Sequence, residues 1–168
     1  NIAVAKLQGF DAFKVVTDEE LKEKITAGIE RLLTFQQSDG GFGYWQGSAE
    51  SYPYLSAYIL HALHQTREAG YTVDAGVIDR TRAYLQQTLR GGKGKRTPYD
   101  DSERAYVLYV LGETGSPDES LLSNLYGNRD ELGIFAKAYL AMSFEKAGDH
   151  RRATSLLQEI LAEAKVSP

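Results

Sequence analysis

The sequence predicts an all-α fold in which antiparallel helical hairpins form two layers. Segments with helical periodicity follow one another along most of the chain, and glycine, proline and capping residues separate them. Segments that are apolar around most of their circumference alternate with segments that carry one charged face. Because an inner helix is covered on most sides and an outer helix faces water on its back, this alternation indicates two layers. The period-2 alternation typical of strands is not sustained in any segment of the sequence outside the predicted helices.

The first three predicted helices follow the order outer, inner, outer. The first runs from residue 17 to about residue 37; Thr17 and Glu20 fit a capping box, and the apolar residues lie on one face. The second covers residues 51–68, is apolar around much of its circumference and stops before Gly70. The third runs over residues 74–91 and carries a single apolar stripe. We therefore expect the second helix to lie inside and its two neighbours outside.

The fourth and fifth predicted helices continue the alternation. The fourth opens at Thr97 and Pro98, and its run 105–111 leaves no polar face in the middle, which predicts an inner helix. The fifth is short and opens at Ser116 and Pro117, an N-cap followed by proline at the first helical position. Only one of its faces is apolar, so we expect it to be an outer helix.

The last two predicted helices are an inner and an outer one. Asn128 and Glu131 can cap the sixth, Gly148 ends it, and Asp149 can cap the seventh, whose apolar residues lie on one side. The apolar residues of the sixth helix are expected to pack in the core: Ile134, Phe135, Ala136, Ala138, Tyr139, Leu140, Ala141, Met142 and Phe144.

A glycine-rich, aromatic segment separates the first two helices. Glycine is needed where the backbone has a positive φ or approaches another group closely, so this segment predicts a helix-to-helix corner of fixed shape. The corner residues are Asp39, Gly40, Gly41, Phe42, Gly43 and Trp45. Tyr44, Tyr52, Tyr54 and Tyr58 surround it, and packing in the core or corner is the favoured role for these rings and for Trp45. Tyr44, Tyr52 and Tyr54 form a candidate contact surface if part of them stays exposed.

Composition indicates a single globular domain over residues 1–168, and a first residue of Asn1 in place of Met predicts that the chain belongs to a longer protein. The net charge of −4 and the scattering of both signs argue against a nucleic-acid partner. The cluster Lys93, Lys95 and Arg96 is separated by glycines and predicts a surface loop. The chain has no cysteine, which excludes disulfides, zinc–thiolate sites and a cysteine nucleophile within it. The sequence contains no run of 18 apolar residues, so direct membrane insertion is not expected.

The remaining polar clusters favour structural roles, and we predict no catalytic, cofactor or metal-binding residues. His61 and His64 lie three residues apart on a predicted helix, and a place at an interhelical contact or on the surface is favoured over a shared metal ion. Asp100, Asp101 and Glu103 stand at a predicted helix start, where capping and the helix dipole explain carboxylates.

The corner sequence resembles the corners of helical toroids, the fold of terpenoid cyclases, protein prenyltransferases and the thioester domains of α2-macroglobulin and complement proteins. Further segments are similar to successive helices and corners of the thioester domain of bacterial α2-macroglobulins, and together they cover almost the whole chain. These segments are 39–45, 54–58, 67–71, 105–111, 125–132 and 146–149. Residues 1–7 resemble the stretch that follows the family's Cys-x-Glu-Gln motif, which this chain does not contain. The resemblance implies an incomplete α/α toroid.

The resemblance implies a fragment of a broad-spectrum protease inhibitor. In that family, cleavage of a bait region exposes an internal thioester, which then captures an amine or hydroxyl of the attacking protease. Since the thioester pair is missing, we expect no acyl transfer and no enzyme activity from this chain alone. Some relatives use a histidine to assist transfer to hydroxyls, but the matching stretch 91–102 contains none. The implied partners are the other domains of the parent macroglobulin and, through it, target proteases. The implied location is periplasmic or extracellular, and a membrane anchor in the parent is left open.

Two alternatives remain open at this point. A terpenoid-cyclase or prenyltransferase-like enzyme would require an acidic or metal-bearing mouth to a closed cavity. A helical-repeat interaction module would require helix pairs at a regular spacing near 34 residues, whereas the predicted outer helices begin near 18, 75, 117 and 150.

Overall fold

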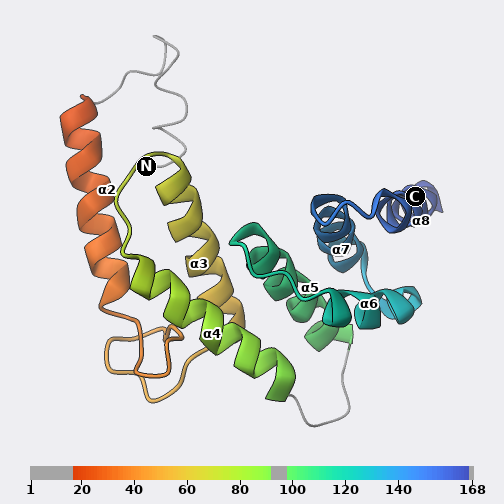
Figure 1. Cartoon of the computed structure of the whole chain (residues 1–168), viewed down its shortest axis with the longest axis horizontal. Helices are drawn as coiled ribbons and strands as arrows, with labels where there is room; N and C mark the ends of the chain where they lie inside the picture. The colour runs from red at the N-terminus through yellow and green to blue at the C-terminus, as the bar shows by residue number, and fades with distance from the viewer. Residues whose placement is uncertain (1–16, 92–97, 167–168) are drawn as a thin grey trace. The chain divides into compact units, whose positions relative to one another are not determined.

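The computed structural model describes residues 17–91 and 98–166, and these residues form helices joined by short corners (Figure 1). The elements are α2 (Asp18–Leu33), α3 (Pro53–Glu68), α4 (Ala75–Gly91), α5 (Pro98–Glu113), α6 (Glu119–Gly127), the 3-10 turn η2 (Arg129–Glu131), α7 (Ile134–Lys146) and α8 (His150–Val166). Within the described residues, extended pairing is limited to one isolated bridge between Gln36 and Phe42. The all-helical prediction is confirmed. The chain divides into two compact units, residues 1–86 and 87–168, which are described separately.

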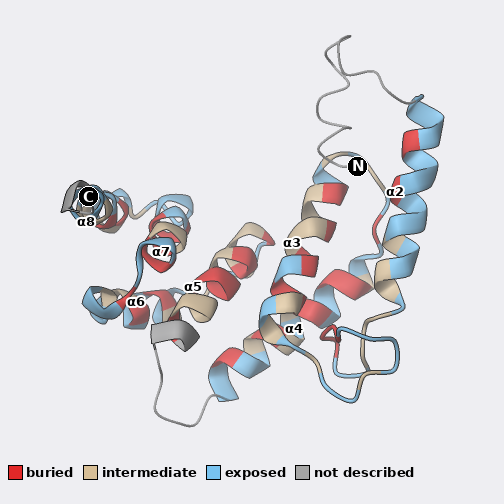
Figure 2. Cartoon of the chain, turned by 180° about the vertical axis from the view of Figure 1, so that it is seen from behind, coloured by how far each residue is buried: buried red, intermediate tan, exposed pale blue. Residues whose placement is uncertain are grey.

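The first unit opens with α2, whose start matches the predicted capping box. The Glu20 amide donates to Thr17 Oγ1 at 3.2 Å, and the Thr17 amide donates back to Glu20 Oε2 at 3.0 Å. Leu21 is buried on one face of the helix, while most other residues face water (Figure 2). The helix ends at Leu33, earlier than predicted: the amides of residues 34–36 donate to carbonyls three residues back, and the Gln37 amide donates to the Gly41 carbonyl in the corner.

Helix α3 buries one face and exposes the other. Its buried residues are Ser56, Ala57, Ile59, Leu60, Leu63 and Thr66. The two buried hydroxyls are satisfied, because Ser56 Oγ donates to the Tyr52 carbonyl at 2.8 Å and Thr66 Oγ1 to that of Ala62 at 2.7 Å. Tyr58 lies exposed on the other side, so α3 is covered less completely than its apolar sequence predicts.

Helix α4 is amphipathic, as predicted. Asp74 caps its first turn by accepting from the Gly76 amide at 2.7 Å. In the first unit its buried face carries Val77, Ile78, Thr81 and Leu85. Buried Thr81 donates to the Val77 carbonyl one turn earlier at 2.9 Å, so its hydroxyl is satisfied within the helix.

The second unit is centred on α5 and α7, which pack against each other. The predicted apolar run of α5 supplies buried residues Ala105, Tyr106, Val107, Leu108, Val110 and Leu111. Across the contact, the rings of Tyr106 and Tyr109 lie 4.9 and 5.4 Å from the ring of Tyr139 on α7. Helix α8 packs on α7, and α6 contacts both α5 and α7.

Two helix starts in the second unit differ from the prediction. Asp118, and not Ser116, caps α6, because Asp118 Oδ1 accepts from the Leu121 amide at 3.1 Å. Residues 129–131 form the separate turn η2, and α7 begins only at Ile134. In both places the residue taken for a cap belongs to the corner that precedes the helix.

Helix α7 is the largest departure from the predicted core. Ala136, Leu140, Ala141 and Phe144 are buried as expected, whereas Ile134, Phe135 and Met142 are exposed. Phe135 is 82% exposed. Among the described residues of this unit, α5, α6 and α8 all pack on α7, yet its face with Phe135 and Met142 stays open to solvent.

Helices α3, α5 and α7 end with the same backbone motif. Each is followed by a glycine with positive φ, namely Gly70 (+88°), Gly115 (+86°) and Gly148 (+80°). The amide after each glycine donates to a carbonyl five residues earlier: Tyr71 to Thr66 at 3.2 Å, Ser116 to Leu111 at 2.8 Å and Asp149 to Phe144 at 2.8 Å. This is the Schellman arrangement, which satisfies the last carbonyls of a helix and turns the chain away.

Candidate functional site: the glycine-rich corner

The predicted corner is a closed loop between α2 and α3. The Gln37 amide donates to the Gly41 carbonyl at 2.8 Å, and the Gly43 amide donates to the Phe35 carbonyl at 3.2 Å. The Tyr52 amide donates to the Phe42 carbonyl at 3.0 Å, which ties the loop to the start of α3. The backbone is therefore held at both ends, as a corner of fixed shape requires.

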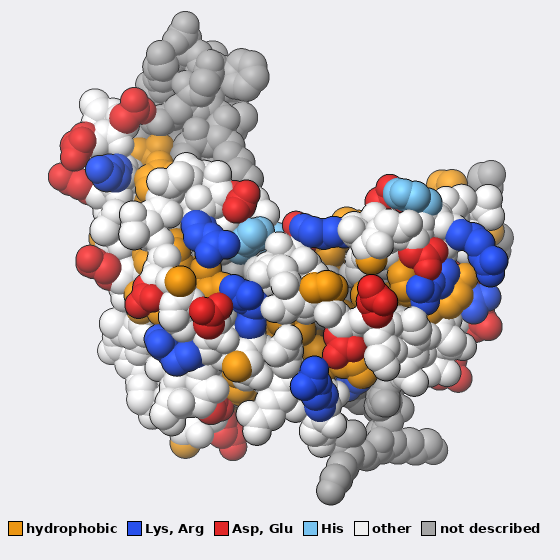
Figure 3. Space-filling model, in the orientation of Figure 1, with side chains coloured by type: hydrophobic (Ala, Val, Ile, Leu, Met, Phe, Trp, Pro, Cys, Tyr) orange, Lys and Arg blue, Asp and Glu red, His pale blue; other side chains and the backbone are white. Residues whose placement is uncertain are grey.

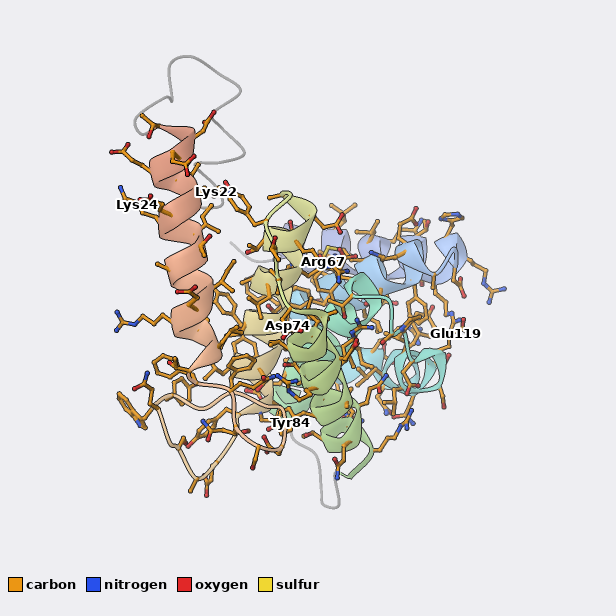
Figure 4. All side chains as sticks on the ribbon, turned by 60° about the vertical axis from the view of Figure 1, so that its left-hand side comes forward. Lys22, Lys24, Arg67, Asp74, Tyr84 and Glu119 are labelled. Carbon is orange, nitrogen blue, oxygen red and sulfur yellow. The ribbon has the colours of Figure 1, made fainter. Side chains whose placement is uncertain are left out.

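Three glycines of the corner are required for different reasons. Gly40 has a φ of +89°, and a Cβ there would lie 2.5 Å from the Arg80 carbonyl oxygen on α4. At Gly41 a Cβ would lie 2.5 Å from Ser51 Cβ and 2.8 Å from Tyr84 Cε1, a ring that lies beside the corner (Figure 4). Gly43 would meet Ser48 Cβ at 2.5 Å. Gly40 thus needs both an unusual φ and space, whereas the other two need space alone.

The side chain of Gln36 joins the corner to α4. Its Nε2 lies 3.2 Å from the Gly40 carbonyl, 3.3 Å from the Val77 carbonyl and 3.1 Å from Thr81 Oγ1. Its Oε1 accepts from Arg80 Nη2 at 2.9 Å. One amide group therefore connects the loop to three residues of α4, and the sequence pattern around Gln36 contains no signal of this role.

Asp39 and Phe42 fix the inner side of the corner. Asp39 Oδ1 accepts from the Gly41 amide at 2.9 Å and from Ser51 Oγ at 2.8 Å. Phe42 is fully buried, and its amide donates to Ser56 Oγ at 2.8 Å. The carboxylate and the ring therefore have structural partners, and sequence reasoning missed both serines because a single serine carries no positional signal.

The aromatic rings at the corner lie outside the core, contrary to the favoured prediction. Trp45 is 76% exposed, Tyr44 54% and Tyr52 39%. The rings of Tyr44 and Tyr52 contact each other with centroids 4.8 Å apart. Phe42 is buried, whereas the rings that follow it in sequence are exposed. Tyr54 is also exposed, on the first turn of α3.

The other sequence-predicted clusters do not form a reactive centre in the described structure. Over residues 17–91 and 98–166, no group of three or more His, Asp or Glu side chains is placed to hold a metal ion. The Nδ1 atom of His64 is buried and has no hydrogen-bond partner. Asp101 is buried beside Arg104, with 3.9 Å between Oδ1 and Nε. Lys93, Lys95, Arg96 and the side chain of Asp100 lie outside the described residues.

A charged cluster in the second unit links α7 to α8. Lys137 is only 3% exposed, and its Nζ pairs with the carboxylates of Glu163 and of Glu159, the latter at 3.5 Å. Arg129 Nε donates to Glu159 Oε1 at 2.8 Å. The hydrogen bond to Glu163 raises the pKa of Lys137 above its ordinary value, so this lysine stays charged. A charged lysine paired in this way acts as a structural clamp.

The start of α8 carries a second charged group and a cavity. Asp149 caps the helix, and its Oδ2 accepts from Arg152 Nε at 2.6 Å; hydrogen bonds from Arg152 lower the pKa of Asp149. The guanidinium of Arg152 lies 4.1 Å from the ring centre of Phe144. A cavity of about 450 Å³ adjoins these residues, with Glu119 and Arg151 also lining it. Acidic and basic side chains both line this cavity, and its lining contains no nucleophile with an adjacent base.

Charges elsewhere are interspersed on the face shown in Figure 3, where acidic and basic side chains alternate without a patch of one sign. Among the described helices, none is both long enough and apolar enough to cross a membrane.

Residues 2–103 match the family model described as the A-macroglobulin TED domain. The chain is 27% identical over 172 residues to an α2-macroglobulin of Escherichia coli K12, an alignment covering 98% of this chain and 10% of that protein. It is 36% identical over 99 residues to an α2-macroglobulin of Thermotoga maritima, covering 59% of this chain and 6% of that protein. The chain thus spans about 10% of the length of the first curated relatives it matches.

Solved structures show the same fold. The crystal structure of native E. coli α2-macroglobulin, from domain MG7 to the C-terminus, superposes with a TM-score of 0.80 at 24% identity, covering 94% of this chain and 26% of that one. The crystal structure of Salmonella α2-macroglobulin reacted with methylamine has a TM-score of 0.78 at 24% identity, covering 88% of this chain and 10% of that one.

Proposed function

Because this chain belongs to the A-macroglobulin TED family, the thioester domain of α2-macroglobulins, we propose that it serves protease trapping in a longer bacterial α2-macroglobulin-like inhibitor. The observation that carries the proposal is the match along nearly the whole chain to a bacterial α2-macroglobulin, together with the shared helical fold, an α/α toroid. We propose that residues 1–168 belong to a single thioester domain of that parent protein.

The proposed reaction needs groups that this chain does not carry. In an internal thioester, an amine attacks the acyl carbon of the glutamine-derived group, the carbon–sulfur bond breaks, and the cysteine leaves as a thiolate that takes up the amine proton. This chain contains no cysteine, so it performs no such transfer by itself. Its contribution is a rigid scaffold, which the corner and the Schellman helix ends provide.

The proposed partners follow from the same assignment. The other domains of the parent would contact this domain, and target proteases would be reached through the parent. A protease inhibitor of this kind acts outside the cytoplasm, so we place the parent in the periplasm or outside the cell.

Methylamine tests the proposal, because it is a small amine that opens thioesters. We expect the 168-residue chain to gain no mass and release no thiol. The parent protein should carry Cys-x-Glu-Gln within some tens of residues before Asn1, and should gain one methylamine and release one thiol. A parent variant with serine in place of that cysteine is the matched control. If the parent gene lacks the motif, the domain serves non-covalent trapping or scaffolding. Turnover of a prenyl diphosphate by this chain would overturn the proposed function.

A further inference from the structure

The cavity beside the start of α8 lies within the second unit and is lined by residues of α6, the end of α7 and the first turn of α8. Its volume of about 450 Å³ lies in the range of about 300–1,000 Å³ that is typical of small-molecule sites. Leu122 and Phe144 are each 2% exposed, so they form a fixed apolar floor, and Ala147 is the third apolar side chain of the lining. The cavity therefore has a preformed apolar part.

Some of the charged side chains at the cavity already have partners. Asp149 Oδ2 accepts from Arg152 Nε at 2.6 Å, and His150 Nδ1 lies 2.9 Å from Glu145 Oε2. A ligand that used either pair would first have to break it. These pairs are therefore part of the frame of the cavity.

Glu119 and Arg151 are different. Glu119 stands on the first turn of α6 (Figure 4), Arg151 stands on the first turn of α8, and both are exposed. Within residues 17–91 and 98–166, neither side chain forms a hydrogen bond or an ion pair, and they do not pair with each other. The charge of Arg151 still reaches the cavity, because it adds to the hydrogen bonds from Arg152 that lower the pKa of Asp149. The cavity thus offers one unpaired charge of each sign beside apolar surface.

A ligand that matches this lining carries an ammonium group, a carboxylate and an apolar body. An arginine guanidinium can bind a carboxylate through two parallel hydrogen bonds, and a glutamate carboxylate accepts from an ammonium group. A single amino acid bears both charges on one carbon, whereas Glu119 and Arg151 belong to different helices and do not reach each other. A dipeptide carries its charges at its two ends and its side chains between them, so it fits this separation.

We infer that this cavity binds a dipeptide with free ends and apolar side chains, with the carboxylate on Arg151 and the ammonium group on Glu119. The inference goes beyond the proposed function, in which the chain is a scaffold, and it does not depend on the thioester of a parent protein. Because the lining contains no nucleophile with an adjacent base, the cavity binds the peptide without hydrolysing it.

NMR titration of the 168-residue chain with leucyl-leucine tests the inference. We expect a Kd on the order of 0.1–1 mM, with amide shifts concentrated in the first turns of α6 and α8. N-acetyl-leucyl-leucine lacks the ammonium group, and leucyl-leucine amide lacks the carboxylate. Each should bind about tenfold more weakly, because each loses one charge-assisted contact.

Two variants assign the ends of the peptide. Arg151→Gln should weaken leucyl-leucine binding about tenfold and remove the difference between leucyl-leucine and its amide. Glu119→Gln should remove the difference between leucyl-leucine and its N-acetyl form in the same way. Arg67→Gln, which changes an exposed arginine of α3 in the first unit, is the matched control and should leave the Kd unchanged. Circular dichroism checks that each variant keeps its helices.

Three results would overturn the inference. The first is the absence of amide shifts at a leucyl-leucine concentration about tenfold above the expected Kd. The second is equal affinity for leucyl-leucine and its two blocked forms, which would mean that apolar contacts alone hold the peptide. The third is an unchanged Kd in a folded Arg151→Gln variant, which would place the carboxylate elsewhere.

Discussion

The carbonyl oxygen of Arg80 occupies the place that a side chain on Gly40 would need. A Cβ built at Gly40 lies 2.5 Å from that oxygen and 2.9 Å from the carbonyl carbon. The Arg80 side chain approaches the same corner from α4, where its Nη2 donates to Gln36 Oε1 at 2.9 Å. The corner and α4 are therefore in contact through backbone as well as through side chains, and the absence of a Cβ at Gly40 permits this approach.

Gly40→Ala should lower the free energy of unfolding by about 2 kcal/mol or more, because the substitution adds a backbone collision to an unfavourable φ. Gly28→Ala is the matched control: Gly28 lies inside α2, and nothing stands within 4 Å of its added Cβ. That control should raise stability by about 0.5–1 kcal/mol, since alanine favours helix. Urea unfolding of both variants measures the difference. Equal midpoints for the two would contradict the assigned role of Gly40.

Phe42→Ala and Trp45→Ala should differ in folding stability, because Phe42 is buried and Trp45 is exposed. Loss of a fully buried phenylalanine costs about 3–5 kcal/mol, whereas loss of an exposed side chain changes stability by about 0.5 kcal/mol or less. Thermal unfolding followed by circular dichroism measures both. A large loss of stability in the Trp45 variant would show that its ring supports the fold.

Lys137→Ala should destabilise the second unit by about 2 kcal/mol, since it removes the buried cation that pairs with Glu163 and leaves Glu159 with Arg129 as its partner. The value is below that for a fully buried pair because the Glu163 carboxylate remains partly in water. Lys146→Ala is the control, because Lys146 is half exposed and pairs with Glu113 at 2.7 Å on the surface. Identical unfolding of the Lys137 and Lys146 variants would contradict the clamp.

The pKa of His150 should lie above its ordinary value. Its Nδ1 lies 2.9 Å from Glu145 Oε2, and the hydrogen bond and charge of that carboxylate raise the pKa of His150. A pKa higher in the folded than in the unfolded chain means that the pair stabilises fully below about pH 6.5 and that this contribution disappears as pH rises through the folded pKa. NMR titration should show the His150 pKa falling in Glu145→Gln. An unchanged His150 pKa in that variant would refute the pairing. Added salt should weaken the His150–Glu145 interaction, because both side chains are exposed.

Helix positions and some helix ends could be predicted from the sequence because they depend on local chemistry. The capping box of Thr17 and the helix-ending glycines at 70 and 148 follow from residue types at fixed spacing, and the structure confirms them. The glycine requirement of the corner was predictable for the same reason. Gly40 has the positive φ, whereas Gly41 and Gly43 are needed for close contacts.

Exposure and long-range side-chain contacts could not be predicted, because they depend on which elements cover each face. The apolar periodicity of α7 gives no indication that Phe135 is left open while Leu140 is buried. Gln36 bonds to Thr81, a residue 45 positions away, and a lone glutamine carries no pattern that points to such a partner. A large apolar ring at Trp45 predicts packing in the corner, but its side chain is exposed, and residue type alone does not indicate which ring of the corner is buried.

Helices α3, α5 and α7 end with the same backbone motif, and this motif restricts few residue types at the three turns. Each reversal uses backbone amides and carbonyls, and the one residue type it requires is the glycine at the positive φ. An added Cβ at Gly70, Gly115 or Gly148 would meet no neighbour within 4 Å, so no side chain elsewhere must match these corners. Each of these three reversals of the chain therefore specifies one glycine, while its hydrogen bonds come from the backbone.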